Sequence, residues 1–379
     1  MQNIFAKITL KNTSGDINNV ICNSAQKGLI PQREYFDKDI ANIENTNGYF
    51  VIQKGDFVYN PRKSVTAPYG PVSLYNYTDD GIVSPLYLCF RAKESINTNF
   101  YEWYFKSSTW HRYIYLYGDS GVRHDRVSIK DSTFFEMPLY IPCKAEQEKL
   151  AQFLSLLESN IQKQQQLVDA LKSYKRGLVF SIFDNNVPFG IQMTPTPLFD
   201  LLTEYRIRDT KDLRVCSVAV NKGIVDQVEH LGRSFSASDT SNYGRVKFGD
   251  MVYTKSPTGD FPYGIVKQNK LNEAVAVSPL YGVYTPKTFD VGNLLHYYFE
   301  QHENANNYIR PLAQKGAKNT INITNQTFLQ GMILFPNSES DCVRLCNILN
   351  TIEQNIIKQE NLLYCLQQQK KWLLQKMFI

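Results

Sequence analysis

The sequence predicts an α+β protein in which two mostly-β domains are separated by an antiparallel coiled coil of two long helices. Three observations support this fold. A long heptad pattern lies in the middle of the 379-residue chain, a second one follows 195 residues later, and the segments that precede them share motifs. Together they indicate an internal repeat related by a pseudo-two-fold axis.

The first heptad pattern covers residues 145–183. Its apolar residues alternate at spacings of four and three, as in a helix that packs along a single seam. Pro142 precedes the pattern, and Glu146 and Glu148 occupy its first turn, where the helix dipole favours negative charge. The expected seam residues are Leu150, Leu154, Leu157, Ile161, Gln164, Val168 and Leu171, followed by Lys175, Leu178 and Ile182.

The second pattern repeats the first, including its polar exceptions. Gln164 recurs as Gln359, and Lys175 recurs as Lys370. A generic amphipathic helix has no reason to repeat such exceptions, so the pattern indicates a duplication. The expected seam residues here are Leu345, Leu349, Ile352, Ile356, Gln359, Leu363 and Leu366.

The globular segments match at a spacing of 194 or 195 residues. The matches are Phe5 with Phe199, Gly55-Asp56-Phe57-Val58-Tyr59 with Gly249-Asp250-Met251-Val252-Tyr253, Tyr69-Gly70 with Tyr263-Gly264, and Val83-Ser84-Pro85-Leu86-Tyr87 with an identical pentapeptide at residues 277–281. Each segment mixes short β-type runs with one aromatic-rich helix, at residues 99–115 and 291–309. We therefore expect domains at residues 1–142 and 185–337 and long helices at residues 143–184 and 338–379.

The linker between the halves, residues 185–197, is rich in Pro and Asn and decides the helix direction. A linker of this length reaches at most about 45 Å, whereas the helix would be about 57 Å long. Parallel helices would strain it, so we expect an antiparallel pair in which Gln164 faces Gln359. Such a pair of amides could pin the register, or both could be partly exposed at a frayed seam.

Composition excludes several classes of protein. Net charge is +5 and is evenly spread, so any phosphate-binding face must be local. No apolar run could span a bilayer and no secretory signal is visible, which favours a soluble, cytoplasmic protein. The seven cysteines form no CxxC pair and are expected to be reduced thiols, and no metal or cofactor motif or catalytic signature occurs.

The repeated long helix after two divergent domains carries a specific resemblance. The first helix has a Pro-x-x-x-Glu-Gln entry from Pro142 to Gln147 and a Lys-Arg-Gly-Leu exit from Lys175 to Leu178. The chain thus resembles the DNA specificity (S) subunit of type I restriction-modification systems. The second helix departs from both borders, with Ser338-Glu339-Ser340-Asp341 at its entry and Lys370-Lys371-Trp372-Leu373 at its exit.

The resemblance implies a function without catalysis by this chain. Each globular half would be a target recognition domain for one half of a bipartite site in double-stranded DNA. The helix pair would set the spacer and dock two modification (methyltransferase) subunits, which carry S-adenosylmethionine and methylate adenine N6. Restriction subunits would join through them. This chain would bind no cofactor itself.

Candidate DNA-binding residues lie in matching polar loops and beside Gly or Pro. The loop candidates are Arg123, His124, Arg126, Lys315, Lys318 and Asn319, and the others are Lys27, Arg62, Lys63, Lys222 and Lys255. Solvated turns and plain surface cations are the alternatives. The aromatic residues Tyr101, Trp103, Tyr104 and Phe105, with Tyr297, Tyr298 and Phe299, are expected in the core. His111 and His296 have no expected partners, and the Ser-Pro-Leu-Tyr pair is expected to pack at a strand edge.

A second hypothesis is a coiled-coil scaffold protein with two ligand-binding β-rich domains and no role with DNA. Salt dependence separates the two, because phosphate contacts weaken as salt rises. The sequence does not give the DNA sequence of either half-site, the spacer length, or whether a complex cleaves DNA.

Overall fold

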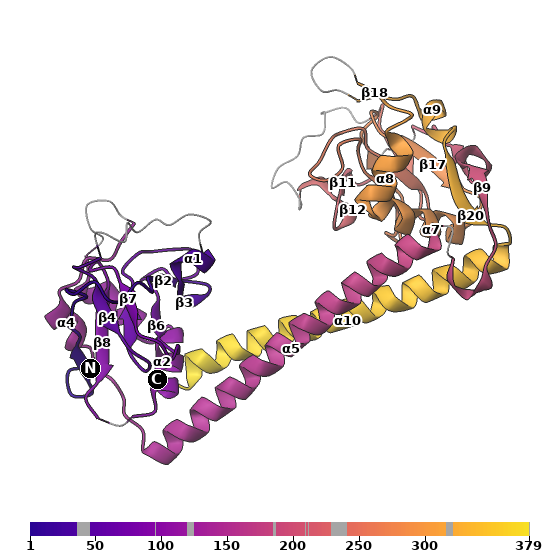
Figure 1. The fold of residues 1–379 in the computed structure, drawn as a ribbon. Coiled ribbons are helices and arrows are strands. Elements are labelled where there is room, and N and C mark those ends of the chain that lie inside the picture. The colour runs from indigo at the N-terminus through magenta and orange to yellow at the C-terminus, as the bar shows by residue number, and fades with distance from the viewer. Residues whose placement is uncertain are drawn as a thin grey trace. The chain divides into compact units, whose positions relative to one another are not determined.

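The computed structural model describes residues 1–35, 46–94, 96–119, 125–184, 187–208, 210, 212–228, 241–315 and 321–378. It divides into two compact units (Figure 1). Unit 1 comprises Met1–Gln165 and Asn361–Ile379, and unit 2 comprises Gln166–Glu360. The long helices α5 (Lys144–Ile182) and α10 (Glu339–Lys376) each contribute residues to both units. Both helices were expected from the heptads, whereas the domain boundaries stay a prediction.

Unit 1 is built on a four-stranded antiparallel sheet in the order β1–β8–β5–β6, with two further strand pairs, β2–β3 and β4–β7. Its described residues also form short helices. The bounds are β1 (Phe5–Lys7), β2 (Ile21–Ser24), β3 (Gly28–Pro31), α1 (Gln32–Tyr35), β4 (Phe50–Ile52), β5 (Phe57–Tyr59), β6 (Val72–Leu74), β7 (Gly81–Val83), β8 (Leu88–Ala92), α2 (Thr98–Lys106), α3 (His111–Tyr117) and α4 (Asp131–Phe135).

Unit 2 has the same sheet order, β10–β17–β14–β15. Its further pairs are β11–β12, β13–β16, β18–β19 and β9–β20. The bounds are η2 (Pro188–Gly190), β9 (Met193–Pro197), η3 (Leu198–Asp200), β10 (Leu202–Glu204), β11 (Cys216–Ala219), β12 (Gly223–Asp226), β13 (Gly244–Val246), β14 (Met251–Tyr253), β15 (Val266–Gln268), β16 (Val275–Val277), β17 (Gly282–Pro286), α7 (Phe289–Glu300), α8 (His302–Ile309), β18 (Gln314–Lys315), β19 (Ile321–Asn322), α9 (Asn325–Leu329) and β20 (Met332–Pro336).

The aromatic residues form the core, as predicted. In unit 1, Phe57 and Phe90 stack across the sheet, and Phe105 of α2 packs against both. In unit 2, Tyr253 and Tyr284 stack on Phe328. The expected core aromatics are buried, except Tyr298, which is half-buried. Because aromatic side chains bury large apolar areas, they supply much of the stability of each small sheet.

The repeated motifs close one hairpin in each unit. The Tyr59 hydroxyl donates to the Tyr69 carbonyl at 2.9 Å, and the Tyr253 hydroxyl donates to the Tyr263 carbonyl at 2.7 Å. The next residue, Gly70 or Gly264, has a φ of 82° or 97°. These motifs therefore hold the frame of each unit.

The long helices run in opposite directions within each unit. In unit 2, Lys172 pairs with Glu360 and Lys175 pairs with Glu353, so positions rise on α5 as they fall on α10. In unit 1, Glu158 of α5 pairs with Lys370 near the end of α10. All fourteen expected seam residues, from Leu150 to Leu171 and from Leu345 to Leu366, are buried or half-buried. The pairing of Gln164 with Gln359 stays a prediction.

Several local expectations were wrong. The sequence matched Phe5 with Phe199, but the strand register makes Leu202 its counterpart. Phe5 pairs with Ala92, and Leu202 pairs with the equivalent residue, Pro286. Each aromatic-rich helix is split in two, at residues 107–110 and at Gln301. The identical pentapeptides end in turns, in which the Tyr87 amide donates to the Ser84 carbonyl at 3.0 Å and residue 281 repeats this bond.

The linker also differs from expectation. Part of it forms β9, which pairs along its whole length with β20. Alternating Thr and Pro favour extended backbone, and the apolar run of β20 offers a strand beside it. Residues 187–197 therefore belong to the packed structure of unit 2.

We predict that Gly70→Ala destabilises unit 1 by about 3 kcal/mol or more. A Cβ at this position would lie 2.0 Å from the Asn60 carbonyl oxygen, and the positive φ adds strain. The matched control is Gly55→Ala, which has a φ of 95° but nothing within 4 Å of the added Cβ. Denaturant unfolding followed by tryptophan fluorescence reports on unit 1, and equal losses in the two variants would contradict the clash.

Candidate nucleic-acid interface

A groove of about 560 Å³ in unit 1 collects three of the predicted cationic residues. Its walls carry Arg62, Lys63 and Arg126, and no Asp or Glu is among the described residues that line it. Arg62 and Arg126 are exposed and Lys63 is half-buried. The groove therefore offers a positive, polar surface of the kind that contacts phosphates.

Backbone pairing brings these residues together. The loop after β5 runs beside residues 125–127, where the Lys63 amide donates to the Asp125 carbonyl at 2.8 Å and the Val127 amide donates to the Pro61 carbonyl at 2.9 Å. Arg62 and Arg126 face one another in an isolated antiparallel bridge. Sequence analysis placed these cations in separate segments, and only the tertiary pairing makes them neighbours.

Two asparagines that line the groove form hydrogen bonds within the fold of unit 1. The Asn23 amide donates to the Val58 carbonyl at 2.7 Å and its oxygen accepts from the Ser73 hydroxyl at 2.7 Å. The Asn60 amide donates to the Asn23 carbonyl at 3.0 Å. These bonds hold the floor rigid and leave little capacity for a ligand.

Gln26 and Gln32 also line the groove, and sequence analysis missed them. Gln26 is exposed and Gln32 is half-buried, and glutamine amides can donate to and accept from base edges. Tyr35 adds an aromatic face to the same groove, and the ammonium of Lys27 lies 5.9 Å from the centre of its ring. The position of Gln26 next to Lys27-Gly28 was the available signal in the sequence.

In unit 2, the candidate cations have different surroundings. Lys222 is exposed at the turn between β11 and β12. Lys255 is half-buried, and burial lowers its pKa although Glu204 acts in the opposite direction. Lys222 is thus the better placed of the two for a phosphate.

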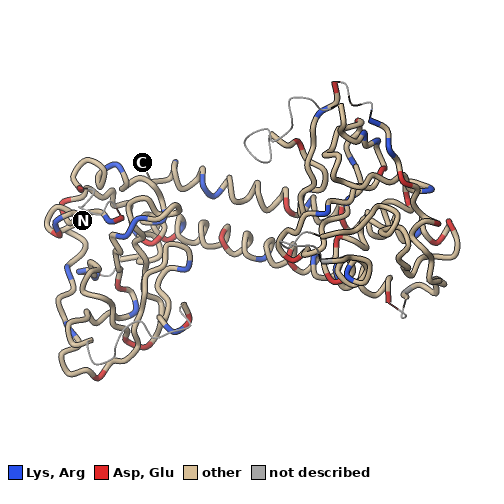
Figure 2. The backbone as a smooth tube through the Cα atoms, turned by 90° about the horizontal axis from the view of Figure 1, so that it is seen from above, with Lys and Arg blue, Asp and Glu red and all other residues tan. Residues whose placement is uncertain are grey.

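The polar-loop candidates fall largely outside the described residues. Arg123, His124, Lys318 and Asn319 lie there, and for Lys315 only the backbone, in β18, is described. Arg126 is the one loop candidate with a described side chain. Figure 2 shows Lys and Arg mixed with Asp and Glu over both units, which agrees with the even charge of the sequence.

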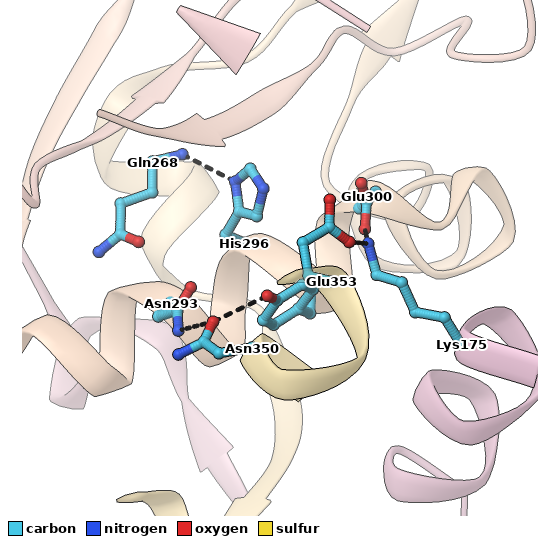
Figure 3. Close-up of polar contacts among 8 residues, drawn as sticks. Lys175, Gln268, Asn293, His296, Glu300, Asn350 and Glu353 are labelled. Carbon is cyan, nitrogen blue, oxygen red and sulfur yellow. Dashed lines mark hydrogen bonds and ion pairs between the residues drawn. The ribbon is translucent and has the colours of Figure 1, made fainter. Parts of the chain in front are cut away.

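A second polar cluster lies in unit 2 where α5, α7 and α10 meet (Figure 3). Lys175 donates to Glu300 at 2.6 Å and forms an ion pair with Glu353 at 2.5 Å. Burial acts to lower the pKa of Lys175, but the two carboxylates outweigh it and the pKa is raised. The Lys175 ammonium also lies 4.9 Å from the centre of the Tyr297 ring.

The same arrangement recurs in unit 1. Lys370 pairs with Glu158 and lies 5.6 Å from the centre of the Trp103 ring. Both Lys and both Glu are related by 195 residues, and each aromatic residue belongs to the helix that follows the main sheet. The two lysine exceptions of the heptads therefore form ion pairs between the long helices, and each also contacts an aromatic ring of a third helix.

His296 has a partner that the sequence did not reveal. The backbone amide of Gln268 donates to the Nδ1 atom of His296 at 3.1 Å (Figure 3). Burial, and then Lys270, Lys267 and Lys175, hold the pKa of His296 well below its usual value. His296 is thus a neutral acceptor in the fold. His111 packs on Tyr69 and Trp110, and burial lowers its pKa as well.

The first part of the chain is similar in sequence to a known protein family. Residues 11–173 match the family model described as the type I restriction modification DNA specificity domain. This segment is therefore similar to a specificity domain of this family. The predicted resemblance to type I specificity subunits is thereby confirmed, and it applies directly to the segment that holds the cationic groove. No curated protein matches the chain.

Solved structures share the fold of the specificity domain and of the rest of the chain. The HsdS subunit from Thermoanaerobacter tengcongensis has 14% identity and a TM-score of 0.50, covering 100% of this chain and 95% of its own. The type I system S subunit from M. genitalium has 11% identity and a TM-score of 0.54, covering 100% and 94%. A chain from a study of assembly and conformational transition of the type I R-M system has 13% identity and a TM-score of 0.56, covering 98% and 94%.

The described residues also bear on metal binding and membrane insertion. Within the described ranges, no three His, Cys, Asp or Glu side chains are grouped so that they could hold a metal ion. Among the described helices, none combines the length and apolarity needed to cross a membrane.

We predict that unit 2 of this chain loses stability in acid through His296. The unfolded state takes up a proton near the ordinary pKa of 6.5, and the folded state resists it. Stability therefore falls as pH drops below that value, by roughly 1 kcal/mol between pH 7 and 5.5. Hydrogen exchange of unit 2 peptides should show this fall, and His296→Asn should remove it.

The control is His302→Asn, because His302 is exposed and paired with its neighbour Glu303. This variant should keep the acid sensitivity of the parent. If His296→Asn retained the full dependence on pH, neutral His296 would not be its source.

Proposed function

We propose that the chain is the sequence-specific DNA-recognition subunit of a type I restriction-modification complex. Each globular half binds one half of a bipartite target, and the helix pair sets the spacer between them. The cationic groove of unit 1 is the single observation that carries the proposal, because it lies within the matched specificity domain. Phosphate contacts from Arg62, Lys63 and Arg126 position the domain, and neighbouring polar groups contact bases.

The two halves combine a shared frame with different loops. Tyr59 and Gly70 close one hairpin as Tyr253 and Gly264 close the other. By contrast, Arg62 and Lys63 correspond to Ser256 and Pro257 at a spacing of 194 residues. An asymmetric target needs such differences, because each base edge is bound by a different side chain.

The long helices form the spacer. An antiparallel coiled coil along the whole of α5 and α10 fixes the distance and the rotation between the two recognition domains. Each added base pair moves and rotates a half-site, so rigid spacing is required for a bipartite target. The opposite directions of the helices within each unit support this proposal.

The chain acts without catalysis of its own. Two modification subunits dock on the helices and adjoining faces, bind S-adenosylmethionine and methylate adenine N6, and restriction subunits join through them. The proposed site residues in DNA contact are Lys27, Arg62, Lys63, Arg126 and Lys222, together with the loop residues outside the described ranges. A scaffold without a DNA role would need no cationic groove, and its binding would not depend on salt in this way.

We predict that Arg62→Ala and Arg126→Ala each weaken DNA binding by the assembled complex about tenfold. Each should also lower the slope of log affinity against log salt by about one, because one phosphate contact is lost. Filter binding at several salt concentrations measures both quantities. Lys54→Ala, at an exposed lysine outside the groove, is the control. An unchanged slope in both groove variants would contradict the interface.

We also predict that one added heptad in each long helix, beside Gln164 and Gln359, lengthens the recognised spacer. Seven residues add about 10.5 Å, which corresponds to about three base pairs. A whole heptad preserves the seam, so both half-sites should stay the same. Methylome sequencing of cells that carry the variant gives the new target. Retention of the original spacer would exclude the helices as its determinant.

A further inference from the structure

The segments that lead into the two long helices are covered differently. The Met1 amino group donates to the Met137 carbonyl at 2.5 Å, and the Leu198 amide donates to the Gly331 carbonyl at 2.9 Å. These bonds make Met137 equivalent to Gly331. Residues 138–142, Pro-Leu-Tyr-Ile-Pro, are therefore the counterpart of β20, Met-Ile-Leu-Phe-Pro.

In unit 2 this segment is a paired strand. β20 pairs with β9 over five residues, from Met332 opposite Pro197 to Pro336 opposite Met193 (Figure 1). Ile333 and Phe335 are only 3% exposed under this cover. The residues just before β9 also pack down, since Ile191 is buried and Val187 contacts the same core.

In unit 1 the equivalent segment has no strand beside it in the part of the chain that the structure describes. The backbone N–H and C=O groups of Leu139, Tyr140 and Ile141 make no hydrogen bond among the described residues. Tyr140 is 72% exposed, and Ile141 is 54% exposed where its counterpart Phe335 is buried. Residues 138–142 are therefore an unpaired segment with exposed apolar side chains, which could pair with an added strand.

An apolar groove of about 480 Å³ adjoins this edge, wholly within unit 1. Leu139 and Tyr140 line it from the segment, and Tyr104, Leu150 and Phe378 line it from the helices. The contact of Phe378 with Tyr104 repeats that of Phe183 with Tyr298 in unit 2. There, the residues that follow Phe183 supply the covering strand.

We propose that residues 138–142 and the adjoining groove bind an extended peptide segment of a partner subunit as an added β-strand. The segment takes the place that β9 takes in unit 2. This inference rests on the proposed function for the existence of partner subunits, but the binding slot itself requires neither DNA nor a spacer. Strand addition suits the site, because main-chain bonds give affinity and side-chain pockets give specificity.

The sequence of β9 defines the chemistry of the occupant. β9 reads Met-Thr-Pro-Thr-Pro, and its prolines cannot donate a hydrogen bond. Thr194 and Thr196 therefore supply the donors, opposite Phe335 and Ile333. In unit 1, Ile141 corresponds to Phe335 and Leu139 to Ile333. Both carry backbone N–H groups, while prolines occupy positions 138 and 142. An uncharged peptide with proline at alternate positions fits this pattern.

The first experiment uses a synthetic peptide of residues 187–197 as the probe and titrates it into the full-length chain by calorimetry. We expect saturable binding, and we expect N-methylation of both Thr194 and Thr196 in the peptide to weaken it at least about tenfold, because two main-chain donors are removed. A scrambled peptide should not bind. Absence of binding at millimolar peptide, or equal binding of the methylated peptide, overturns the proposal.

Two variants locate the binding. Ile141→Asp places a charge on the open strand at an exposed position, so the fold should persist, and we expect it to abolish binding. Leu116→Asp is the matched control, since Leu116 is 60% exposed in the same unit and does not line the groove. Equal effects of the two variants overturn the assignment. Self-association of the chain that the peptide reverses would assign the slot to a second copy and also overturn it.

The second experiment compares hydrogen exchange of residues 137–142 in the chain alone and in the complex with its methyltransferase subunits. We expect the amides of Leu139 and Ile141 to gain protection in the complex. Unprotected amides in a complex that still binds its DNA target overturn this inference and leave the proposed function intact. If these amides are protected but the complex does not recognise DNA, the proposed function is contradicted and this inference stands.

Discussion

The ion pair between a seam lysine and a glutamate of the opposite long helix is the interaction on which each unit depends. Lys175 with Glu353, and Lys370 with Glu158, connect α5 to α10 at points where the apolar seam is interrupted. Lys175 is buried, and Glu353, Lys370 and Glu158 are half-buried, so removing one partner leaves a partly desolvated charge without its counterion. Each lysine also covers an aromatic ring of the neighbouring domain helix, so the pair fixes the domain on the helices as well as the helices on each other.

This arrangement explains which parts of the chain are repeated. The repeated residues keep the frame: Tyr59 and Tyr253 close a hairpin, and Asp56 and Asp250 accept backbone amides at the strand start. Around Asp56 the halves already differ, since Arg91 pairs with it, whereas Thr285 bonds to Asp250. Burial raises the pKa of Asp250, although the bonds from the Lys247 backbone amide and Thr285, and the charge of Lys247, act to lower it. The residues that differ most lie in the loops, where a recognition surface needs variety.

The open edge at residues 138–142 shows a different asymmetry. Unit 2 lies in the middle of the chain, so the segment between α5 and η3 can return as β9 and cover β20. In unit 1 no described strand pairs with residues 138–142. The two units thus share a sheet order but differ in the pairing of this segment, and that difference is the basis of the proposed strand addition.

The sequence by itself determined the two long helices, their seam, and the repeated frame, because heptads and short motifs express local rules of periodicity and turn geometry. It also identified Arg62, Lys63 and Arg126 as candidates. Only the tertiary structure decided that these three share one groove, that the linker becomes β9, and that His296 accepts a bond from Gln268. Each of these depends on pairing between segments far apart in the chain, and no local pattern of residues encodes which distant strand or loop will be the neighbour.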